Sequence, residues 1–197
     1  MSGIKLGLTG SIGCGKSTAG ALFGEAGFAR SDSDLVVKEL LRSDPEVLRA
    51  IRERFGDEMM LPEGGVDRAA MAKVVFTDKT ELKWLETLLH PRVSATWQAR
   101  VQAEPEADWC VEIPLLFEKN LEKHFDFTVC LYASERTQLA RLAGRGVSED
   151  QARARIRRQL PLDQKVARAD FVLLNDGDHA FLRQQVFFLI EQLLPAS

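Results

Sequence analysis

The chain has 197 residues, 45% of them apolar and 28% charged, proportions typical of a globular protein that can bury its own core. A formal net charge of −3 gives no overall attraction to nucleic acid, and no run of about 18 or more apolar residues predicts a membrane span. Three cysteines without a close pair argue against a disulfide framework and a zinc site: Cys14, Cys110 and Cys130. Residues 1–10 are too short for a signal peptide, so we expect a cytoplasmic protein with no nucleic-acid or membrane partner.

The start of the chain predicts a strand, a glycine-rich loop, a helix and a second strand. Residues 4–9 form a short apolar run that ends at Gly10, which is typical of a buried strand. From Lys16 onward, apolar residues recur at helical spacing. Residues 28–31 predict a short second strand, although polar Arg30 weakens its apolar signal.

Residues 35–101 have a different pattern, because apolar residues recur at helical spacing and no strong strand signal appears. Turn-rich stretches interrupt the pattern at residues 61–65 and at His90-Pro91. His90 could end a helix, since proline disfavours helical geometry in the residue before it. We interpret this part of the chain as a helical insertion.

Strand signals return at residues 109–113, 127–132 and 171–174, with helical patterns between them. A last helix is expected over residues 179–194. The alternation of strands and helices predicts an α/β fold, in which a parallel sheet of five strands has helices on both faces.

Residues 10–17 match the phosphate-loop pattern Gly-x-x-x-x-Gly-Lys-Ser in full, between an expected strand and an expected helix. Glycines let the backbone curl with its N–H groups facing a phosphate, and the following helix directs its positive end at the same anion. Lys16 is expected to contact the β- and γ-phosphates of ATP, Ser17 to bind Mg²⁺ and Thr18 to contact the α-phosphate. The expected ATP-binding residues of the loop are Gly10, Gly13, Cys14, Gly15, Lys16, Ser17 and Thr18.

Two features favour a small-molecule kinase over other proteins with this loop. The chain lacks the Asn-Lys-x-Asp run with which GTPases read guanine. Asp32 and Asp34 follow the expected second strand, and ligands of open parallel sheets bind beyond the carboxyl ends of the strands. One of these acids could act as a general base toward an acceptor hydroxyl, or the two could cap the next helix.

Residues 136–168 are strongly basic and predict a lid whose arginines close over the phosphate being transferred. Arg141 and Arg145 are four residues apart and share a helix face. For most of the other arginines, a solvated pair of basic helices is the alternative. Glu149 and Arg153 are expected to form a surface ion pair.

Several motifs, in order along the chain, resemble the dephospho-coenzyme A kinase family. Besides the phosphate loop and the Asp-x-Asp pair, they are Phe55-Gly56, Asp67-Arg68, Leu85-Glu86, His90-Pro91-Arg92-Val93, Ile113-Pro114-Leu115-Leu116-Phe117-Glu118, Gln138, Arg141, Arg145, Ala169-Asp170-Phe171-Val172 and Asn175. The chain departs from the family's usual loop at Ser11 and Cys14, where glycine and serine are usual.

The resemblance implies a three-layer α/β fold of the phosphate-loop nucleotide-kinase type, to which a helical domain and a lid are added. The core would comprise residues 1–34, 106–135 and 163–197, the CoA-binding domain residues 35–105 and the lid residues 136–162. The substrates implied are ATP and dephospho-CoA, with Mg²⁺ as cofactor. We expect a monomer or a weak homo-oligomer.

The activity implied is transfer of the ATP γ-phosphate to the ribose 3′-hydroxyl of dephospho-CoA, the last step of coenzyme A synthesis. By the family's pattern, the catalytic residues are Asp34 as base, Lys16 and Arg141. Arg141 would lie near the phosphates of ATP and Asn175 near its adenine. The substrate-binding residues would be Asp34, His90 and Arg92.

Other interpretations stay open. Glu112 ends an expected strand and could hold Mg²⁺ through water or face solvent, and Glu118 could cap a helix or pair with a lid arginine. His179 is expected on the surface or in a loop. Rival functions are a nucleoside or nucleotide kinase and a regulatory protein that binds nucleotide without turnover.

Overall fold

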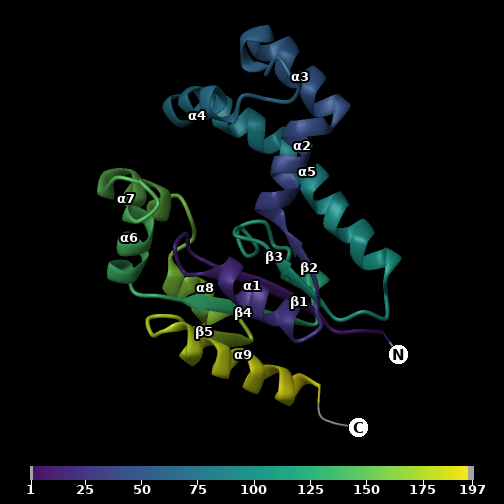
Figure 1. Ribbon diagram of the computed structural model, residues 1–197, viewed down its shortest axis with the longest axis vertical. Helices are drawn as coiled ribbons and strands as arrows, with labels where there is room; N and C mark the ends of the chain where they lie inside the picture. Colours follow the sequence, from purple (N-terminus) through teal and green to yellow (C-terminus); the bar gives the residue numbers. More distant parts are fainter. Residues whose placement is uncertain (1, 195–197) are drawn as a thin grey trace. The chain divides into compact units, whose positions relative to one another are not determined.

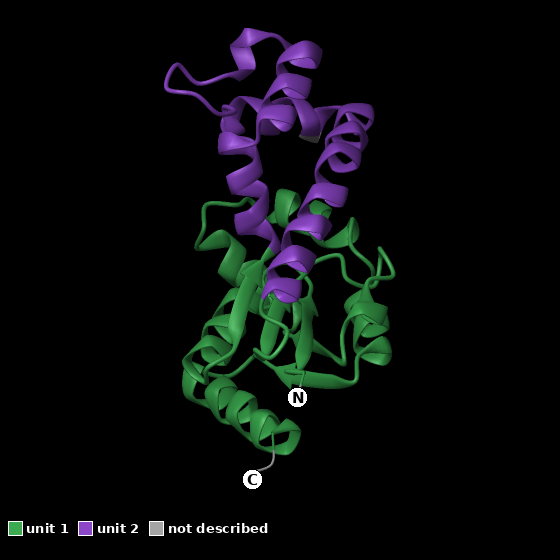
Figure 2. Cartoon of the chain, turned by 90° about the vertical axis from the view of Figure 1, so that its right-hand side faces the viewer, with its two compact units in different colours: residues 1–32, 104–197 green, residues 33–103 purple. Residues whose placement is uncertain are grey.

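The computed structural model describes residues 2–194. The chain forms two compact units, of which the first joins Met1–Asp32 to Glu104–Ser197 and the second is Ser33–Ala103 (Figure 2). Met1 and residues 195–197, which belong to the expected core domain, lie outside the described residues. The expected lid, residues 136–162, lies within the first unit.

The first unit contains a parallel sheet of five strands in the order β2-β3-β1-β4-β5 (Figure 1). The strands are β1 Lys5–Gly10, β2 Ala29–Asp32, β3 Trp109–Glu112, β4 Phe127–Tyr132 and β5 Phe171–Leu174. The predicted α/β fold with a five-stranded parallel sheet is therefore confirmed. Because all strands run the same way, their carboxyl ends meet at one edge, and central β1 leads directly into the phosphate loop.

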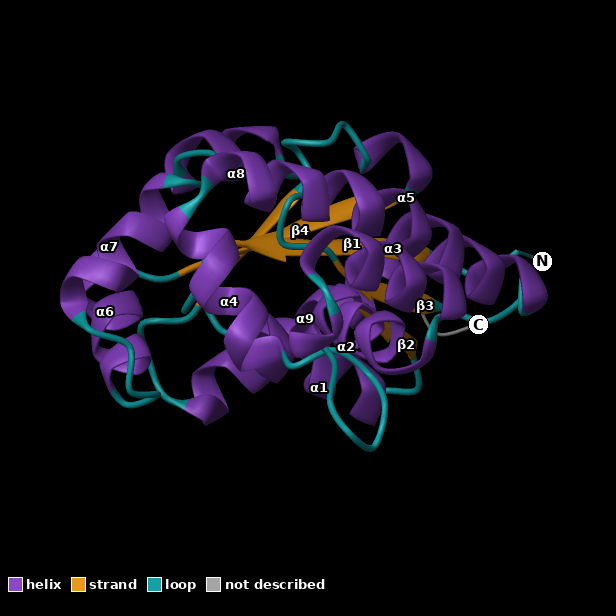
Figure 3. Cartoon of the chain, turned by 90° about the horizontal axis from the view of Figure 1, so that it is seen from above, coloured by secondary structure: helices purple, strands orange, loops and turns teal. Residues whose placement is uncertain are grey.

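Helices cover both faces of this sheet. The helices of the first unit are α1 Lys16–Glu25, α6 Glu135–Ala143, α7 Glu149–Arg157, α8 Leu162–Arg168 and α9 His179–Leu193, with a short 3₁₀ turn, η2, at Glu122–His124. Helices α1 and α9 pack together on one face and α8 packs against β1 and β4 on the other (Figure 3). Leu6 and Leu8 of β1 meet Phe23 of α1 and Val186 of α9 in the core between sheet and helices, where all four side chains are buried.

Polar Arg30 fits in β2 because it pairs with a buried acid on the neighbouring strand. Its guanidinium lies 2.7 Å from Oε1 of Glu112, a residue that is only 3% exposed. The alternative that Glu112 faces solvent at a strand end is therefore wrong. Burial raises the pKa of Glu112, and the hydrogen bond from Arg30 opposes that rise.

The same ion pair explains a glycine in the middle of α1. A Cβ added to Gly20 would stand 2.1 Å from Oε1 of Glu112 and 3.0 Å from the guanidinium of Arg30. Glycine inside a helix costs about 1 kcal/mol relative to alanine. Here it leaves room for two charged groups between α1 and the sheet.

The second unit is helical, as the sequence predicts. Its elements are α2 Ser33–Ser43, α3 Pro45–Phe55, the 3₁₀ turn η1 Asp57–Met59, α4 Arg68–Thr77 and α5 Lys79–Ala103. Asp44 and Asp67 cap α3 and α4 by accepting hydrogen bonds from backbone N–H groups of the first turn. Its own apolar core includes Ile51, Met71 and Leu85.

The expected break at His90-Pro91 is wrong, because α5 runs through both residues. A proline inside a helix removes one backbone hydrogen bond and costs about 3 kcal/mol. Along α5, residues at every fourth position are buried, which favours one continuous helix by more than the proline costs. These residues are Leu85, Leu89, Val93, Trp97 and Val101.

We predict that Arg30→Met lowers the free energy of unfolding by about 2–3 kcal/mol at pH 7, because Glu112 stays buried without its partner. In the variant, the pKa of Glu112 rises further, because the hydrogen bond from Arg30 that opposes the rise is gone. A carboxyl with a raised pKa stabilises the fold below its unfolded pKa, and that stability is lost as pH rises through the folded pKa. The loss should therefore be larger at pH 8 than at pH 5. Urea unfolding at both pH values measures it, with Arg49→Met as the exposed control. An equal loss at both pH values would contradict this account.

Candidate active site

The phosphate loop connects β1 to α1 and depends on glycine at close contacts. Gly15 has a φ of +93°, in the left-handed region, and a Cβ there would stand 2.2 Å from the amide nitrogen of Asn175. Cys14 beside it is fully buried, and burial raises the pKa of its thiol, so the sulfur fills space as a neutral group. Backbone curvature rather than side-chain chemistry is what this part of the loop contributes.

Lys16 is the first residue of α1, and its ammonium folds back over the loop. Nζ donates to the carbonyl oxygens of Gly10 at 3.0 Å and Ser11 at 3.2 Å. Ser17 and Thr18 follow in the first helical turn and are exposed. Backbone N–H groups and the positive end of the helix dipole thus lie beside an ammonium and two hydroxyls, an arrangement suited to bind an anion.

Two side chains from distant parts of the chain hold the outer carbonyls of the loop. Nη1 of Arg141, from α6, lies 3.3 Å from the carbonyl oxygen of Gly13, and Nη2 donates to the carbonyl oxygen of Asn175 at 2.9 Å. The buried amide of Asn175 donates to the carbonyl oxygen of Cys14 at 2.7 Å. Because each peptide unit is planar, a carbonyl held outward directs the following N–H inward, toward the place of a phosphate.

A cleft of about 340 Å³ opens beside the loop in the first unit. It is lined by Gly15, Thr18, Arg141, Gly144, Arg145, Asn175, Gly177, His179 and Leu182. Arg141 and Arg145 both reach it, as their spacing suggests. His179, which opens α9 and lines the cleft, is not among the site residues predicted from the sequence.

Asp176 joins the loop after β5 to the start of α6. Its carboxylate accepts hydrogen bonds from the N–H and hydroxyl of Ser134, which caps α6. Hydrogen bonds from Thr137 and then Ser134 lower the pKa of Asp176 below its usual range. Arg141 is on the helix that this contact positions.

The other expected site residues belong to the second unit. Asp34 is the second residue of α2, inside the first turn rather than at the cap position, and its side chain is exposed. Both His90 and Arg92 lie on α5, where residues two apart point about 200° away from each other. His90 and Arg92 therefore do not share a face of α5. The guanidinium of Arg92 lies 2.9 Å from a carboxylate oxygen of Glu46.

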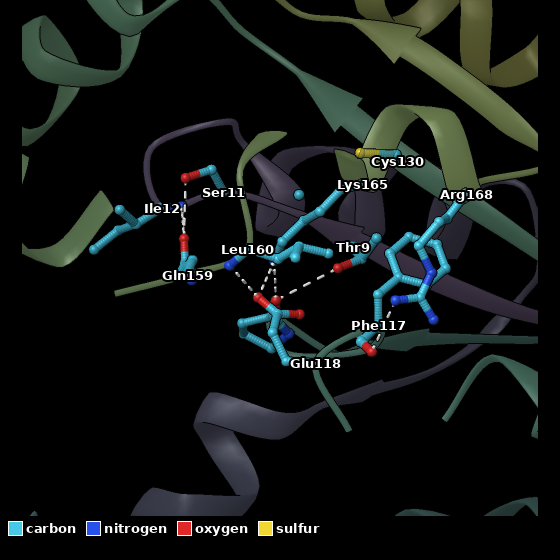
Figure 4. Close-up of polar contacts among 12 residues, drawn as sticks. Thr9, Ser11, Ile12, Phe117, Glu118, Cys130, Gln159, Leu160, Lys165 and Arg168 are labelled. Atoms are coloured by element: carbon cyan, nitrogen blue, oxygen red, sulfur yellow. Dashed lines mark hydrogen bonds and ion pairs between the residues drawn. The ribbon is translucent and has the colours of Figure 1, made fainter. Parts of the chain in front are cut away.

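The expected pairs of the basic segment have two different outcomes. Glu149 and Arg153 form the predicted surface ion pair, with a separation of 2.9 Å. Glu118 pairs with Lys165 of α8 at 2.9 Å rather than with a lid arginine (Figure 4).

Within the part of the chain that the structure describes, no group of three or more His, Cys, Asp or Glu side chains could hold a metal ion. Mg²⁺ bound together with a nucleotide takes many of its ligands from phosphates and water, so the protein need not supply a complete set of ligands. The exposed Ser17 hydroxyl at the start of α1 is suited to supply one of them. Among the described helices, none is both long and apolar enough to cross a membrane.

Comparisons with known proteins identify the family of this chain. A family model described as "Dephospho-CoA kinase" matches residues 4–180. The chain belongs to the dephospho-CoA kinase family. A dephospho-CoA kinase of Gloeobacter violaceus is 40% identical over 188 residues, which cover 95% of this chain and 91% of that protein.

Two solved structures share the fold of this chain. TT1252 from Thermus thermophilus superposes with a TM-score of 0.83 at 31% identity, over 100% of both chains. A dephospho-CoA kinase from Campylobacter jejuni gives 0.70 at 26% identity, over 95% of this chain and 96% of that one. The suggested family and the kinase fold are thereby confirmed.

We predict that Asn175→Ala weakens ATP binding roughly 10-fold, because the Cys14 carbonyl and Arg141 each lose a hydrogen-bond partner in a buried place. Calorimetric titration with ATP measures the dissociation constant, and a circular dichroism spectrum checks the fold. Unchanged ATP affinity in a folded variant would show that this side chain does not hold the loop.

Proposed function

We propose that this protein transfers the γ-phosphate of ATP to the ribose 3′-hydroxyl of dephospho-CoA, giving coenzyme A and ADP. The observation that carries the proposal is the family match over residues 4–180. The phosphate loop and its supporting side chains supply the chemistry that such a transfer needs.

ATP binding follows from the geometry of the first unit. Its phosphates would lie on the N–H groups of the loop and the start of α1, with Lys16 on the β- and γ-phosphates and Thr18 near the α-phosphate. The cleft beside the loop would take the adenosine, where His179, Arg145 and Leu182 offer flat and apolar surfaces. Asn175 lines the same cleft and would lie near adenine. Its amide nitrogen is held in place by the carbonyl oxygen of Cys14.

Mg²⁺ would be held by the Ser17 hydroxyl together with phosphate oxygens, and it would neutralise part of their charge. Arg141 would add positive charge next to the loop from outside, and it is already fixed there by the carbonyls it contacts. Closure of the basic lid over bound ATP would limit the access of water, which would otherwise compete with the acceptor for the γ-phosphate.

Asp34 would orient the acceptor hydroxyl and receive its proton during in-line transfer. Support comes from its place in the chain: β2 ends at Asp32, and Asp34 follows by two residues. The second unit, Ser33–Ala103, would bind dephospho-CoA, with His90 and Arg92 as contacts. We further propose that the protein works in the cytoplasm as a monomer or weak homo-oligomer; three free thiols agree with a reducing compartment.

The deciding experiment measures ADP release with ATP, Mg²⁺ and a panel of acceptors. Dephospho-CoA should be phosphorylated far faster than nucleosides, nucleotides or water. A faster reaction with a nucleoside would identify a nucleoside kinase instead. ATP binding without turnover on any acceptor would identify a regulatory protein.

We predict that Asp34→Asn lowers turnover by roughly 10²–10⁴-fold, the usual contribution of general acid–base catalysis, with little change in ATP affinity. Asp57→Asn serves as the control, because Asp57 is an exposed carboxylate of the same unit and should leave turnover unchanged. Near-normal turnover of purified Asp34→Asn would exclude this role.

A further inference from the structure

A cluster of polar contacts joins the phosphate loop to the segment between α7 and α8 (Figure 4). Its centre is Gln159, whose Oε1 accepts one hydrogen bond from the hydroxyl of Ser11 at 3.0 Å and another from the N–H of Ile12 at 2.9 Å. Ser11 is buried, with 2% of its surface exposed. The two residues belong to the first half of the phosphate loop, where neither Arg141 nor Asn175 makes contact.

The chemistry of these contacts requires an acceptor at this place. A backbone N–H can only donate, so the oxygen of the Gln159 amide, and not its nitrogen, must face the N–H of Ile12. The Ser11 hydroxyl then donates to the same oxygen. This second contact depends on the hydroxyl of Ser11, which a glycine or an alanine at this position would lack.

The backbone next to Gln159 is fixed from behind. The N–H of Leu160 donates to Oε1 of Glu118 at 2.9 Å, and the ammonium of Lys165 lies 2.9 Å from the same oxygen. Lys165 is fully buried, and it also donates to the carbonyl oxygen of Pro114 at 2.7 Å. A buried ammonium is stable only with such partners, and it therefore holds Glu118 and the adjoining backbone in one arrangement.

The basic helix α7 ends at Arg157, two residues before Gln159. The segment after it is tied on one side to the loop following β3, through Glu118, and on the other to the phosphate loop, through Gln159. Gln159 is thus a second point, besides Arg141, at which the basic segment contacts the phosphate loop.

We propose that Gln159 is a positioning residue, which holds Ser11 and Ile12 in the conformation that binds phosphate and anchors the end of the basic segment to the loop. Ser11 is its second partner and strengthens the contact in this chain. This inference rests on the proposed function only for the use of ATP as ligand, because the loop must hold phosphate whichever acceptor is used.

The test compares Gln159→Met, which keeps side-chain length and removes the acceptor, with the same change at exposed Gln164 in α8. We expect Gln159→Met to weaken ATP binding about 10-fold, by calorimetry without any acceptor, and to leave the KM for dephospho-CoA unchanged. Ser11→Ala should weaken ATP binding about threefold, and in the Gln159→Met background it should cause no further loss. Gln164→Met should bind ATP like the wild type.

Nuclear magnetic resonance supplies a readout that general destabilisation would not give. The amide proton of Ile12 should shift upfield in Gln159→Met when its hydrogen bond is lost, and remain in place in Gln164→Met. If Gln159→Met does not fold, Ser11→Ala still tests the contact, because it removes only the hydroxyl. Unchanged ATP affinity with an unshifted Ile12 amide, additive losses in the double variant, or an equal effect of Gln164→Met would each overturn the proposal. Failure of the acceptor panel with intact ATP binding would count only against the choice of acceptor.

Discussion

The rest of the site depends on how the polar groups on the outside of the phosphate loop are held. A loop that turns its N–H groups toward a phosphate must turn carbonyl groups outward, and buried carbonyls need donors. Here Lys16, Arg141 and Asn175 provide them, and Gln159 accepts from the first half of the loop. These side chains come from α1, α6, the end of β5 and the segment after α7. The loop therefore adopts its phosphate-binding conformation only when the whole first unit has folded.

Two ion pairs, each with one buried partner, serve that requirement at β3 and the loop that follows it. Glu112, at the end of β3, is neutralised by Arg30 of β2, and Glu118, six residues on, by Lys165 of α8. Such pairs add little net stability, since removing charges from water costs about as much as their attraction returns. Their effect is to permit one arrangement of the strands and helices that carry the phosphate loop.

Local signals allowed much of this to be predicted from the sequence. The phosphate loop, the strands and the helical insertion could be recognised because glycine spacing and apolar periodicity act over a few residues. The pairing of Glu112 with Arg30 and the place of His179 in the cleft could not, because they join residues far apart in sequence. At Pro91 local propensity predicted a helix end, and burial along α5 outweighed it. The roles of Asp34, His90 and Arg92 stay predictions.

The proposed acceptor is one particular hydroxyl of one particular substrate, the ribose 3′-hydroxyl of dephospho-CoA. A ¹H–³¹P correlation spectrum of the product formed from ATP and dephospho-CoA tests it most directly. Our account predicts a new phosphomonoester signal coupled to the ribose H3′ proton, in step with ADP formation. Coupling to a different ribose proton, or inorganic phosphate in place of a phosphorylated product, would contradict it.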